Sequence, residues 1–283
     1  MRMNRKRIEK ALEEALSDVR DSRVREAMAY ALLAGGKRIR PLFLFAVSTG
    51  YGVPEEEGMA LACALEMIHT YSLIHDDLPA MDDDDFRRGR LACHKQFDEA
   101  TAILAGDGLL TEAFRLAVKA PVSADRLLTC VQVLAAMAGA SGMVYGQCLD
   151  LAEDDSYDWE MVKNVHRYKT GCLLAAPFMI GALLGGQREE CVQKWKEVGM
   201  NIGLAFQIQD DLLDETGSVE KLGKSSSDQR NNKVTSVSLL GVQEAEKRMR
   251  KYYAESRRLI CEMPSFDAEP LFELLEMIQN RDR

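Results

Sequence analysis

The residues Phe206 to Asp214 read FQIQDDLLD, and three carboxylates here interrupt an otherwise apolar helical run. Asp210 and Asp214 stand four residues apart and share one helix face, while Asp211 is turned away and Gln207 lies one turn earlier. Charged side chains in such a setting are normally paired or bound to metal. The stretch predicts a helix of a helical bundle, in which inward-facing side chains build a metal or cofactor site.

The remaining chain favours helices almost throughout. Ala, Leu, Glu, Met, Lys and Arg fill most segments, and alternating β-branched runs are almost absent. The polar stretch 216–232 is the exception, and a loop of that length is usually functional or mobile. We expect a single all-α domain over residues 1–283, a large helical bundle. Its predicted helices are 5–19, 22–34, 38–50, 55–77, 96–119, 123–139, 141–152, 158–183, 189–215, 234–261 and 267–280.

Composition excludes several classes of protein. The net charge of −9 argues against a general nucleic-acid binder, which needs a basic face. The 7 cysteines include no CxxC pair and no zinc-type spacing, as expected for reduced thiols. The start of the chain has no signal-peptide pattern. No uninterrupted apolar run reaches the roughly 18 residues of a membrane span. A cytoplasmic protein without stable membrane insertion is expected.

A second acidic motif, DDLPAMD, covers Asp76 to Asp82. Its first two carboxylates fall at the C-terminal end of a predicted helix, where negative charge is unfavourable. Pro79 disfavours helical geometry at the preceding residue, so Asp82 has to return to Asp76 through an irregular turn. A solvated acidic turn is the simplest interpretation of either motif alone. The pair instead indicates a hard cation with oxygen ligands, and Mg²⁺ is the natural candidate.

Basic residues gather at separate places. GGKRIRP covers residues 35–41, RR follows the first acidic motif at 87–88, and YKTG covers 168–171. A single Lys, Arg or His is usually a surface charge or a satisfied polar group. In combination, metal-bearing carboxylates can hold one phosphate group while a Lys/Arg cluster holds another directly. The sequence therefore predicts two phosphorylated substrates bound side by side.

Taken together, GGKRIRP, HDDLPAMDDDDFRRG, CHK, GQCLDL, YKTG, FQIQDDLLD and NKVT closely resemble the trans-isoprenyl diphosphate synthase family. The resemblance covers nearly the whole chain. It implies the isoprenoid synthase fold with a central cavity, a homodimer, and three Mg²⁺ ions for each active site. It also implies that isopentenyl diphosphate condenses with dimethylallyl or geranyl diphosphate through ionisation, condensation and proton elimination.

The resemblance assigns roles residue by residue. Metal binding falls to the two acidic motifs, namely Asp76, Asp77, Asp82, Asp210, Asp211 and Asp214. The isopentenyl diphosphate site is Lys37, Arg40, His69 and Arg88, and the allylic diphosphate site is Arg87, Lys169, Lys224 and Lys233. The residues expected to carry catalysis are Lys169, Thr170, Gln207, Asp76 and Asp210.

Product length is expected to depend on Tyr71 and Ser72, which precede the first acidic motif. An aromatic ring five residues before Asp76 would form the floor of the product cavity. With the DD-x4-D spacing, it resembles bacterial farnesyl diphosphate synthases; a geranylgeranyl diphosphate synthase is the alternative. A terpene cyclase and a non-catalytic regulatory subunit fit less well, because both acidic motifs are intact. Tyr145, Ser236 and the loop after Gly223 depart from the family pattern.

Overall fold

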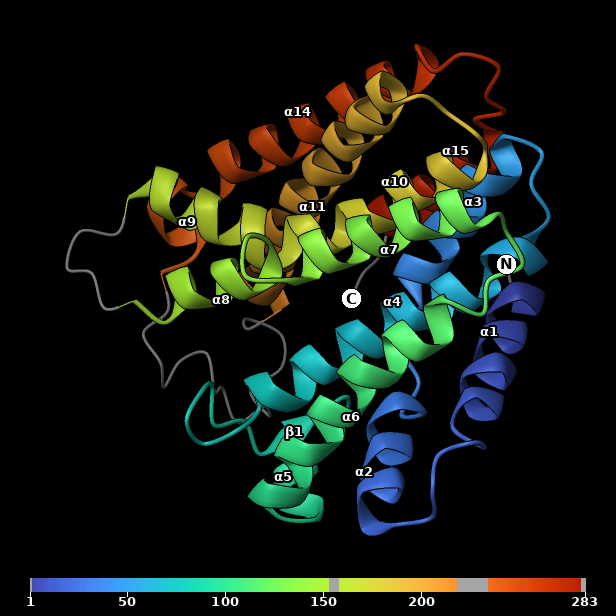
Figure 1. Cartoon of the computed structure of the whole chain (residues 1–283). Helices are drawn as coiled ribbons and strands as arrows, with labels where there is room; N and C mark the ends of the chain where they lie inside the picture. The colour runs from blue at the N-terminus through green and yellow to red at the C-terminus, as the bar shows by residue number, and fades with distance from the viewer. Residues whose placement is uncertain (1, 153–157, 218–233, 281–283) are drawn as a thin grey trace.

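The computed structural model describes residues 2–152, 158–217 and 234–280. Its elements, in chain order, are α1 (Arg2–Ala15), α2 (Arg23–Leu32), α3 (Ile39–Gly50), α4 (Glu55–Asp76), β1 (Phe86–Arg87), β2 (Arg90–Leu91), α5 (Cys93–Gln96), α6 (Glu99–Ala117), α7 (Ala124–Ala138), α8 (Met143–Asp150), α9 (Trp159–Val165), the π-helix η1 (His166–Cys172), α10 (Leu173–Leu184), α11 (Glu189–Gly217), α13 (Ser236–Leu240), α14 (Val242–Cys261) and α15 (Glu269–Gln279). The expected all-α fold is confirmed (Figure 1).

The core is built around α10, whose side chains are apolar and almost all buried. This helix packs against α3, α7 and α11, and α4 packs against α6. Three aromatic residues fill the contact of α3, α10 and α11. The ring centroids of Phe43 and Phe178 lie 4.6 Å apart, and Phe178 stacks on Trp195 at 6.0 Å. An interior helix explains why its sequence shows no polar face.

Two predicted helices are divided in the structure, and a third begins later than expected. The helix expected at 158–183 contains the π-helix η1 between α9 and α10. The helix expected at 234–261 breaks at Gly241, whose φ of 73° lies in the left-handed region. The helix expected from residue 96 begins at Glu99, because the side chain of Asp98 caps it by accepting from the amide of Thr101 at 2.7 Å.

A small β-hairpin, β1–β2, was not expected. Its two strands pair antiparallel, with Phe86 opposite Leu91 and Arg87 opposite Arg90. Arg88 and Gly89 form the turn, and both have positive φ. Strands of two residues show no hydrophobic alternation, so periodicity could not reveal them.

One described stretch, Ala124–Asp150, is long and apolar enough to cross a membrane by length and composition alone. The criterion of uninterrupted apolar residues had missed it. Its most apolar window is 39% buried within the protein. A turn divides the stretch into α7 and α8, where the amide of Gly142 donates to the carbonyl of Gly139 at 2.9 Å. These features are those of a helix pair packed on a bundle.

Candidate active site

The first acidic motif lies where α4 ends. The helix finishes at Asp76, and Asp77 caps it. The amide of Asp82 donates to the carbonyl of Asp76 at 2.8 Å, so the turn containing Pro79 brings the chain back to the helix end. The predicted irregular turn is confirmed. Burial raises the pKa of Asp76, and the nearby carboxylate of Asp82 raises it further.

Asp77 is buried and carries an incompletely compensated charge. Burial raises its pKa to about 6, although hydrogen bonds from Arg87 act in the opposite direction. The Nε atom of Arg87 lies 2.8 Å from Oδ1 of Asp77, and its Nη2 donates both to that oxygen and to Asp84. Arg87 therefore clamps the motif. Raised pKa values despite this clamp mark a place where additional positive charge is favourable.

Two residues of α8 extend the site. The side-chain nitrogen Nε2 of Gln147 donates to Oδ1 of Asp76 at 2.6 Å. One helical turn later, Asp150 accepts from Nζ of Lys169 at 2.6 Å. Lys169 also lowers the pKa of Asp76, against the larger effect of burial. The sequence had indicated no role for Gln147 or Asp150, although both belong to the GQCLDL motif. Their spacing of three residues puts them on one face of a helix, and this was the signal that could have revealed them.

The π-helix η1 presents the expected catalytic pair, Lys169 and Thr170. Gly146 of α8 packs so closely on the backbone of Lys169 that a Cβ atom there would overlap it. The hydroxyl of Thr170 donates to Oε1 of Gln207 on α11 at 3.1 Å. The structure thus brings these three predicted residues together. Single-turn π-helices within α-helices frequently occur at functional sites.

The second acidic motif lies on α11, and neutral donors hold the carboxylate of its Asp211. Oδ2 of Asp211 accepts from the amide of Ser236 at 2.8 Å and from its hydroxyl at 2.6 Å. Its Oδ1 accepts from Gln207 at 3.4 Å. Asp210 is half-buried and Asp214 is exposed. The small residue at 236, a departure from the family pattern, therefore ties α13 to the motif.

The two motifs share one electrostatic environment. Burial lowers the pKa of His166, the first residue of η1, whereas Asp211 and then Asp150 raise it. Asp150 and Lys169 act on Asp76 as well. The first acidic motif, η1 and the second acidic motif therefore surround one region. In Figure 1, the end of α4, the hairpin and α8 lie toward the same side of the molecule.

The carboxylates suit a hard cation by their chemistry. Among the described residues, no three His, Cys, Asp or Glu side chains are gathered closely enough to hold a metal ion. Mg²⁺, however, commonly takes only one or two carboxylates, several waters and substrate phosphate oxygens. Buried carboxylates with raised pKa values, Asp76 and Asp77, fit that manner of binding.

A cluster of cations lies beside the first acidic motif. Burial lowers the pKa of Arg40 to about 10, and Arg88 lowers it further against the opposing effect of Glu66. Burial also lowers the pKa of His69 well below its usual range, with contributions from Arg40 and Arg88. The Nε atom of Arg40 is buried without a hydrogen-bond partner. Mutually repelling, partly desolvated cations are the features of an anion site.

Arg38 differs in role from its neighbours in GGKRIRP. Its Nη1 donates to Glu66 at 2.8 Å and its Nη2 to the carbonyl of Leu32 at 2.8 Å, in a fully buried pair. Its φ of 53° places it in the left-handed region before α3. Lys37 is exposed, whereas Arg40 is half-buried. The side chain of Arg38 therefore points into the core, while that of Lys37 points to solvent. The sequence alone had not indicated this structural role of Arg38.

The expected product-length residues lie on α4 below Asp76. Tyr71 is 7% exposed and belongs to the core, with its ring edge-to-face on His75 at 5.7 Å. Burial raises the pKa of the Tyr71 hydroxyl, and Asp76 raises it further. The hydroxyl of Ser72 donates to the carbonyl of His69 at 2.9 Å. Their positions are those that the sequence predicted, and their role remains a prediction.

Other sequence predictions lie elsewhere. Lys224 and Lys233 are outside the described residues. Tyr145, the bulky residue that departs from the family pattern, is 42% exposed and rests edge-to-face on Tyr168 of η1 at 4.9 Å.

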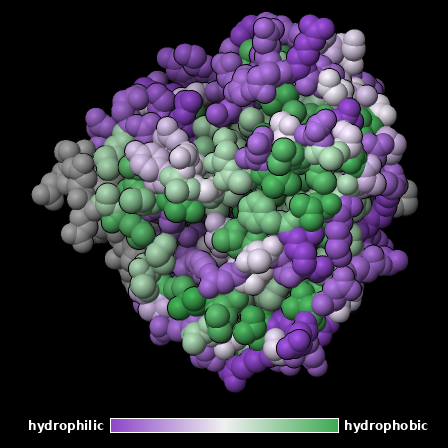
Figure 2. Space-filling model, viewed as in Figure 1, coloured by the Kyte–Doolittle hydropathy of each residue, from purple (hydrophilic) through white to green (hydrophobic). Residues whose placement is uncertain are grey.

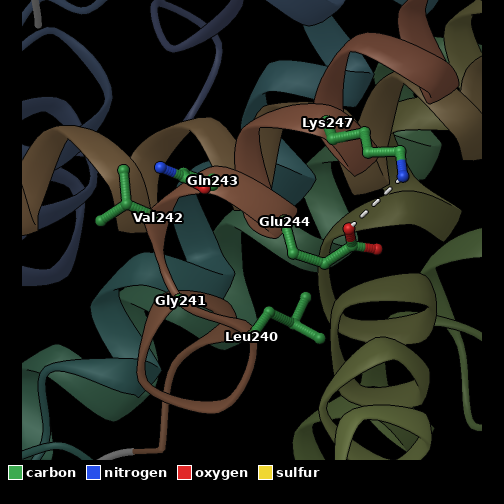
Figure 3. A pocket seen from close by; sticks show the side chains of 6 residues that line it. All are labelled: Leu240, Gly241, Val242, Gln243, Glu244 and Lys247. Atoms are coloured by element: carbon green, nitrogen blue, oxygen red, sulfur yellow. Dashed lines mark ion pairs between the residues drawn. The ribbon is translucent and has the colours of Figure 1, made fainter.

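Figure 3 shows a surface hollow at the turn between α13 and α14. Glu244 and Lys247 form an ion pair of 3.8 Å beside it. The hollow is lined by Leu240, Gly241, Val242, Gln243, Glu244 and Lys247. None of these is a predicted site residue, so the candidate active site does not include the hollow.

The chain is similar along most of its length to known prenyl diphosphate synthases. The chain is 46% identical over 270 residues to a farnesyl diphosphate synthase of Bacillus subtilis, covering 94% of this chain and 90% of that protein. A geranylgeranyl pyrophosphate synthase of Arabidopsis thaliana is 40% identical over 280 residues, covering 97% of this chain and 75% of the plant protein.

Solved structures give the same result. A geranyltranstransferase from Thermotoga maritima matches with a TM-score of 0.84 and 35% identity, covering 99% of each chain. An FPP/GFPP synthase from Zymomonas mobilis matches with a TM-score of 0.86 and 33% identity, covering 100% of this chain and 97% of that one. The family model for polyprenyl synthetase matches residues 21–262. The chain therefore belongs to the polyprenyl synthetase family.

Proposed function

We propose that the protein is a trans-prenyltransferase that condenses isopentenyl diphosphate with dimethylallyl and then geranyl diphosphate to give (2E,6E)-farnesyl diphosphate. One observation carries the proposal. Lys169 is bonded to Asp150 and acts on Asp76 of the first motif, and its neighbour Thr170 bonds to Gln207 on the helix of the second motif. A separate cation cluster around Arg40 and Arg88 stands beside the first motif. Two anion sites of different chemistry, placed next to each other, suit two diphosphate substrates.

The residues divide the work by charge. Asp76, Asp77 and Asp82, together with Asp210, Asp211 and Asp214, would hold Mg²⁺, which when bound would supply the positive charge that neutralises the leaving allylic diphosphate. Arg87 and Lys169 donate hydrogen bonds to that diphosphate from fixed positions. On the other side, Lys37, Arg40, His69 and Arg88 bind isopentenyl diphosphate so that its double bond lies against the allylic carbon.

The reacting carbons lie near Thr170 and Gln207, whose mutual hydrogen bond fixes the direction of both side-chain dipoles. Their oxygen atoms stabilise the allylic cation electrostatically without attacking it. The double bond of isopentenyl diphosphate forms the new carbon–carbon bond, and the proton then lost passes to the released diphosphate. The site needs no side-chain nucleophile, and its apolar surroundings exclude the water that would quench the cation.

The test is a product assay. The purified protein is incubated with Mg²⁺, isopentenyl diphosphate and either dimethylallyl or geranyl diphosphate, and the chain length of the product is measured. Farnesyl diphosphate as the main product supports the proposal. A C20 main product establishes the geranylgeranyl alternative, which the plant relative favours. No condensation at all would refute the enzyme assignment and leave the regulatory subunit.

Tyr71 is the residue that the C15 product depends on. Its ring is buried one turn below Asp76. We expect Tyr71→Ala to shift the main product from C15 to C20, because the cavity gains room for another isoprene unit. Phe in place of Tyr71 is the matched control and keeps the C15 product, since the ring remains. Unchanged chain length in Tyr71→Ala would contradict a floor at this position.

We also propose a homodimer in the cytoplasm. Large apolar side chains are exposed on α6, α7 and α8, and Figure 2 shows hydrophobic surface gathered on the face that these helices present. The members include Ile103, Leu104, Leu128, Val144 and Tyr145. Exposed patches of this kind often mark protein–protein or membrane contacts. Sedimentation of the detergent-free protein at twice the monomer mass supports a homodimer; a monomer that binds vesicles would contradict it.

A further inference from the structure

The hairpin β1–β2 contains a strained turn that needs support. Arg88 and Gly89 have φ values of 54° and 75°, the left-handed pair of a two-residue hairpin turn. Gly adopts this conformation freely, but a residue with a Cβ atom, such as Arg88, is strained in it. Arg87 and Arg90 also stand directly opposite each other across the pair, and like charges so placed repel.

Tyr30 of α2 supplies this support. Its hydroxyl donates to the backbone carbonyl of Leu91 at 2.8 Å. The guanidinium of Arg90 lies over its ring, 4.1 Å from the centroid, and Phe97 packs against the ring edge-to-face at 5.6 Å. A neutral aromatic face binds Arg90 without drawing on the acidic residues, so Asp77 and Asp84 stay available to Arg87.

The anchored hairpin carries one arginine toward each diphosphate site. Arg87, in β1, is bound to the first acidic motif through Asp77. Arg88, in the turn, donates to the carbonyl of Gly35 in the GGKRIRP segment. A Cβ atom at Gly36 would lie 2.8 Å from the guanidinium of Arg88, so the glycine leaves room for that side chain. A displacement of β2 would therefore move Arg88, whereas Arg87 is held as well by Asp77 and Asp84.

We propose that Tyr30 is a positioning residue for isopentenyl diphosphate binding. Through Leu91 and Arg90 it holds the hairpin, and the hairpin places Arg88 in the cation cluster with Arg40 and His69. The proposal rests on the proposed function for its substrate. Tyr30 itself acts only through the hairpin, because its hydroxyl and its ring are both used within the protein.

The experiment compares Tyr30→Phe with Tyr30→Leu. Phe keeps the ring under Arg90 and removes only the hydroxyl, whereas Leu removes both contacts. Tyr51→Phe is the control, because the Tyr51 hydroxyl also takes part in a hydrogen bond, from Trp195 at 2.9 Å, but belongs to the core between α3 and α11. Steady-state kinetics give kcat and KM for each substrate. Hydrogen–deuterium exchange of residues 84–93, without substrate, reports on the hairpin independently of activity.

We expect Tyr30→Leu to raise KM for isopentenyl diphosphate about tenfold, with kcat within about twofold, and to speed hairpin exchange about tenfold. Tyr30→Phe should show a smaller change, about threefold, and Tyr51→Phe no change in KM or hairpin exchange. Unchanged KM in a folded Tyr30→Leu, or a loss of kcat alone, would overturn the proposal. If Tyr30→Leu does not fold, Tyr30→Phe decides on the same criteria. If the wild type condenses nothing, the proposed function fails, and unchanged exchange in the variants would still overturn the positioning role.

Discussion

The two acidic motifs are supported in opposite ways. Asp77 of the first motif is clamped by the cation Arg87, and Lys169 acts on Asp76. Among the described residues, Asp211 of the second motif accepts hydrogen bonds from the neutral groups of Ser236 and Gln207. Both motifs lie toward the C-terminal ends of their helices, where the helix dipole adds negative potential: α4 ends at Asp76, and α11 ends at Gly217, three residues after Asp214.

This difference indicates that uncompensated charge distinguishes the first motif, and a fixed carboxylate orientation the second. The first motif keeps raised pKa values even with cationic neighbours, so burial there exceeds the compensation that the protein supplies. In the second motif, hydrogen bonds hold the Asp211 carboxylate in one orientation. The first motif should therefore govern the demand for cations, and the second should govern geometry. Four substitutions test this division, from the largest expected effect to the smallest.

Asp76→Asn should have the largest effect. It keeps the size of the side chain and removes the charge that attracts Lys169 and accepts the hydrogen bond from Gln147. We expect kcat/KM for the condensation to fall about a thousandfold, roughly 4 kcal/mol of transition-state stabilisation. The exposed Asp125, at the start of α7, is the control, and Asp125→Asn should leave activity unchanged. A loss smaller than about tenfold in Asp76→Asn would remove the first motif from the chemistry.

Asp77→Asn should stabilise the folded protein and reduce its activity. The pKa of Asp77 is about 6 in the folded chain, above the 3.8 of an ordinary aspartate. The folded state therefore binds the proton more tightly, and that contribution to stability is complete below about pH 4 and is lost as the pH rises through about 6. Asn cannot ionise, so the variant keeps the contribution at neutral pH. The upper bound is about 3 kcal/mol for a shift of this size.

The measurement is urea unfolding of wild type and Asp77→Asn with EDTA present, at several pH values. The difference in free energy of unfolding should be near zero around pH 3.5 and should reach its full size, in favour of the variant, above about pH 7. A difference that does not change with pH would show that Asn acts through packing. A more stable wild type at pH 7.5 would mean that Arg87 compensates Asp77 fully.

Arg87→Met removes the hydrogen bonds to Asp77 and should destabilise the protein, whereas Asp77→Asn should stabilise it. It leaves Asp77 buried without its cationic partner, at a cost of about 2 kcal/mol in free energy of unfolding. The cost is limited because Asp77 responds by taking up a proton. We also expect KM for the allylic substrate to rise more than tenfold. Arg250→Met, at an exposed position of α14, is the control for loss of one arginine; an equal rise in this KM would show that general charge matters more than the clamp.

The sequence predicted most of the fold because helices have a regular pattern. The bounds of α3 and α4 agree with prediction within a residue, and the return of Asp82 to Asp76 followed from Pro79 alone. It did not predict the π-helix η1, because one extra residue in a turn leaves no trace in composition. The hairpin β1–β2 was missed for its shortness.

The parts of the candidate site that could be predicted are those formed by residues close together in the sequence. The aspartates could be recognised because several carboxylates in one segment are unusual. Gln147 could not be assigned to Asp76, because the two are 71 residues apart and only packing brings them together. Arg38 and Arg40 look equivalent in the sequence, and only the left-handed φ of Arg38 and its buried partner Glu66 distinguish them.

Ser236→Ala should have the smallest effect and is the sharpest test of the comparison. It removes the hydroxyl bond of 2.6 Å to Asp211 but keeps the backbone amide bond of 2.8 Å and the bond from Gln207. One neutral hydrogen bond contributes about 1 kcal/mol, so kcat should fall about fivefold. Because the charge at the second motif is unchanged, the Mg²⁺ concentration for half-maximal activity should stay within about twofold. Ser123→Ala, at the exposed start of α7, is the control, because the Ser123 side chain makes no capping hydrogen bond there. If Ser236→Ala instead raises this Mg²⁺ concentration more than about tenfold, then Ser236 influences the charge as well as the geometry of the second motif, and the two motifs are not divided in the way their hydrogen bonds indicate.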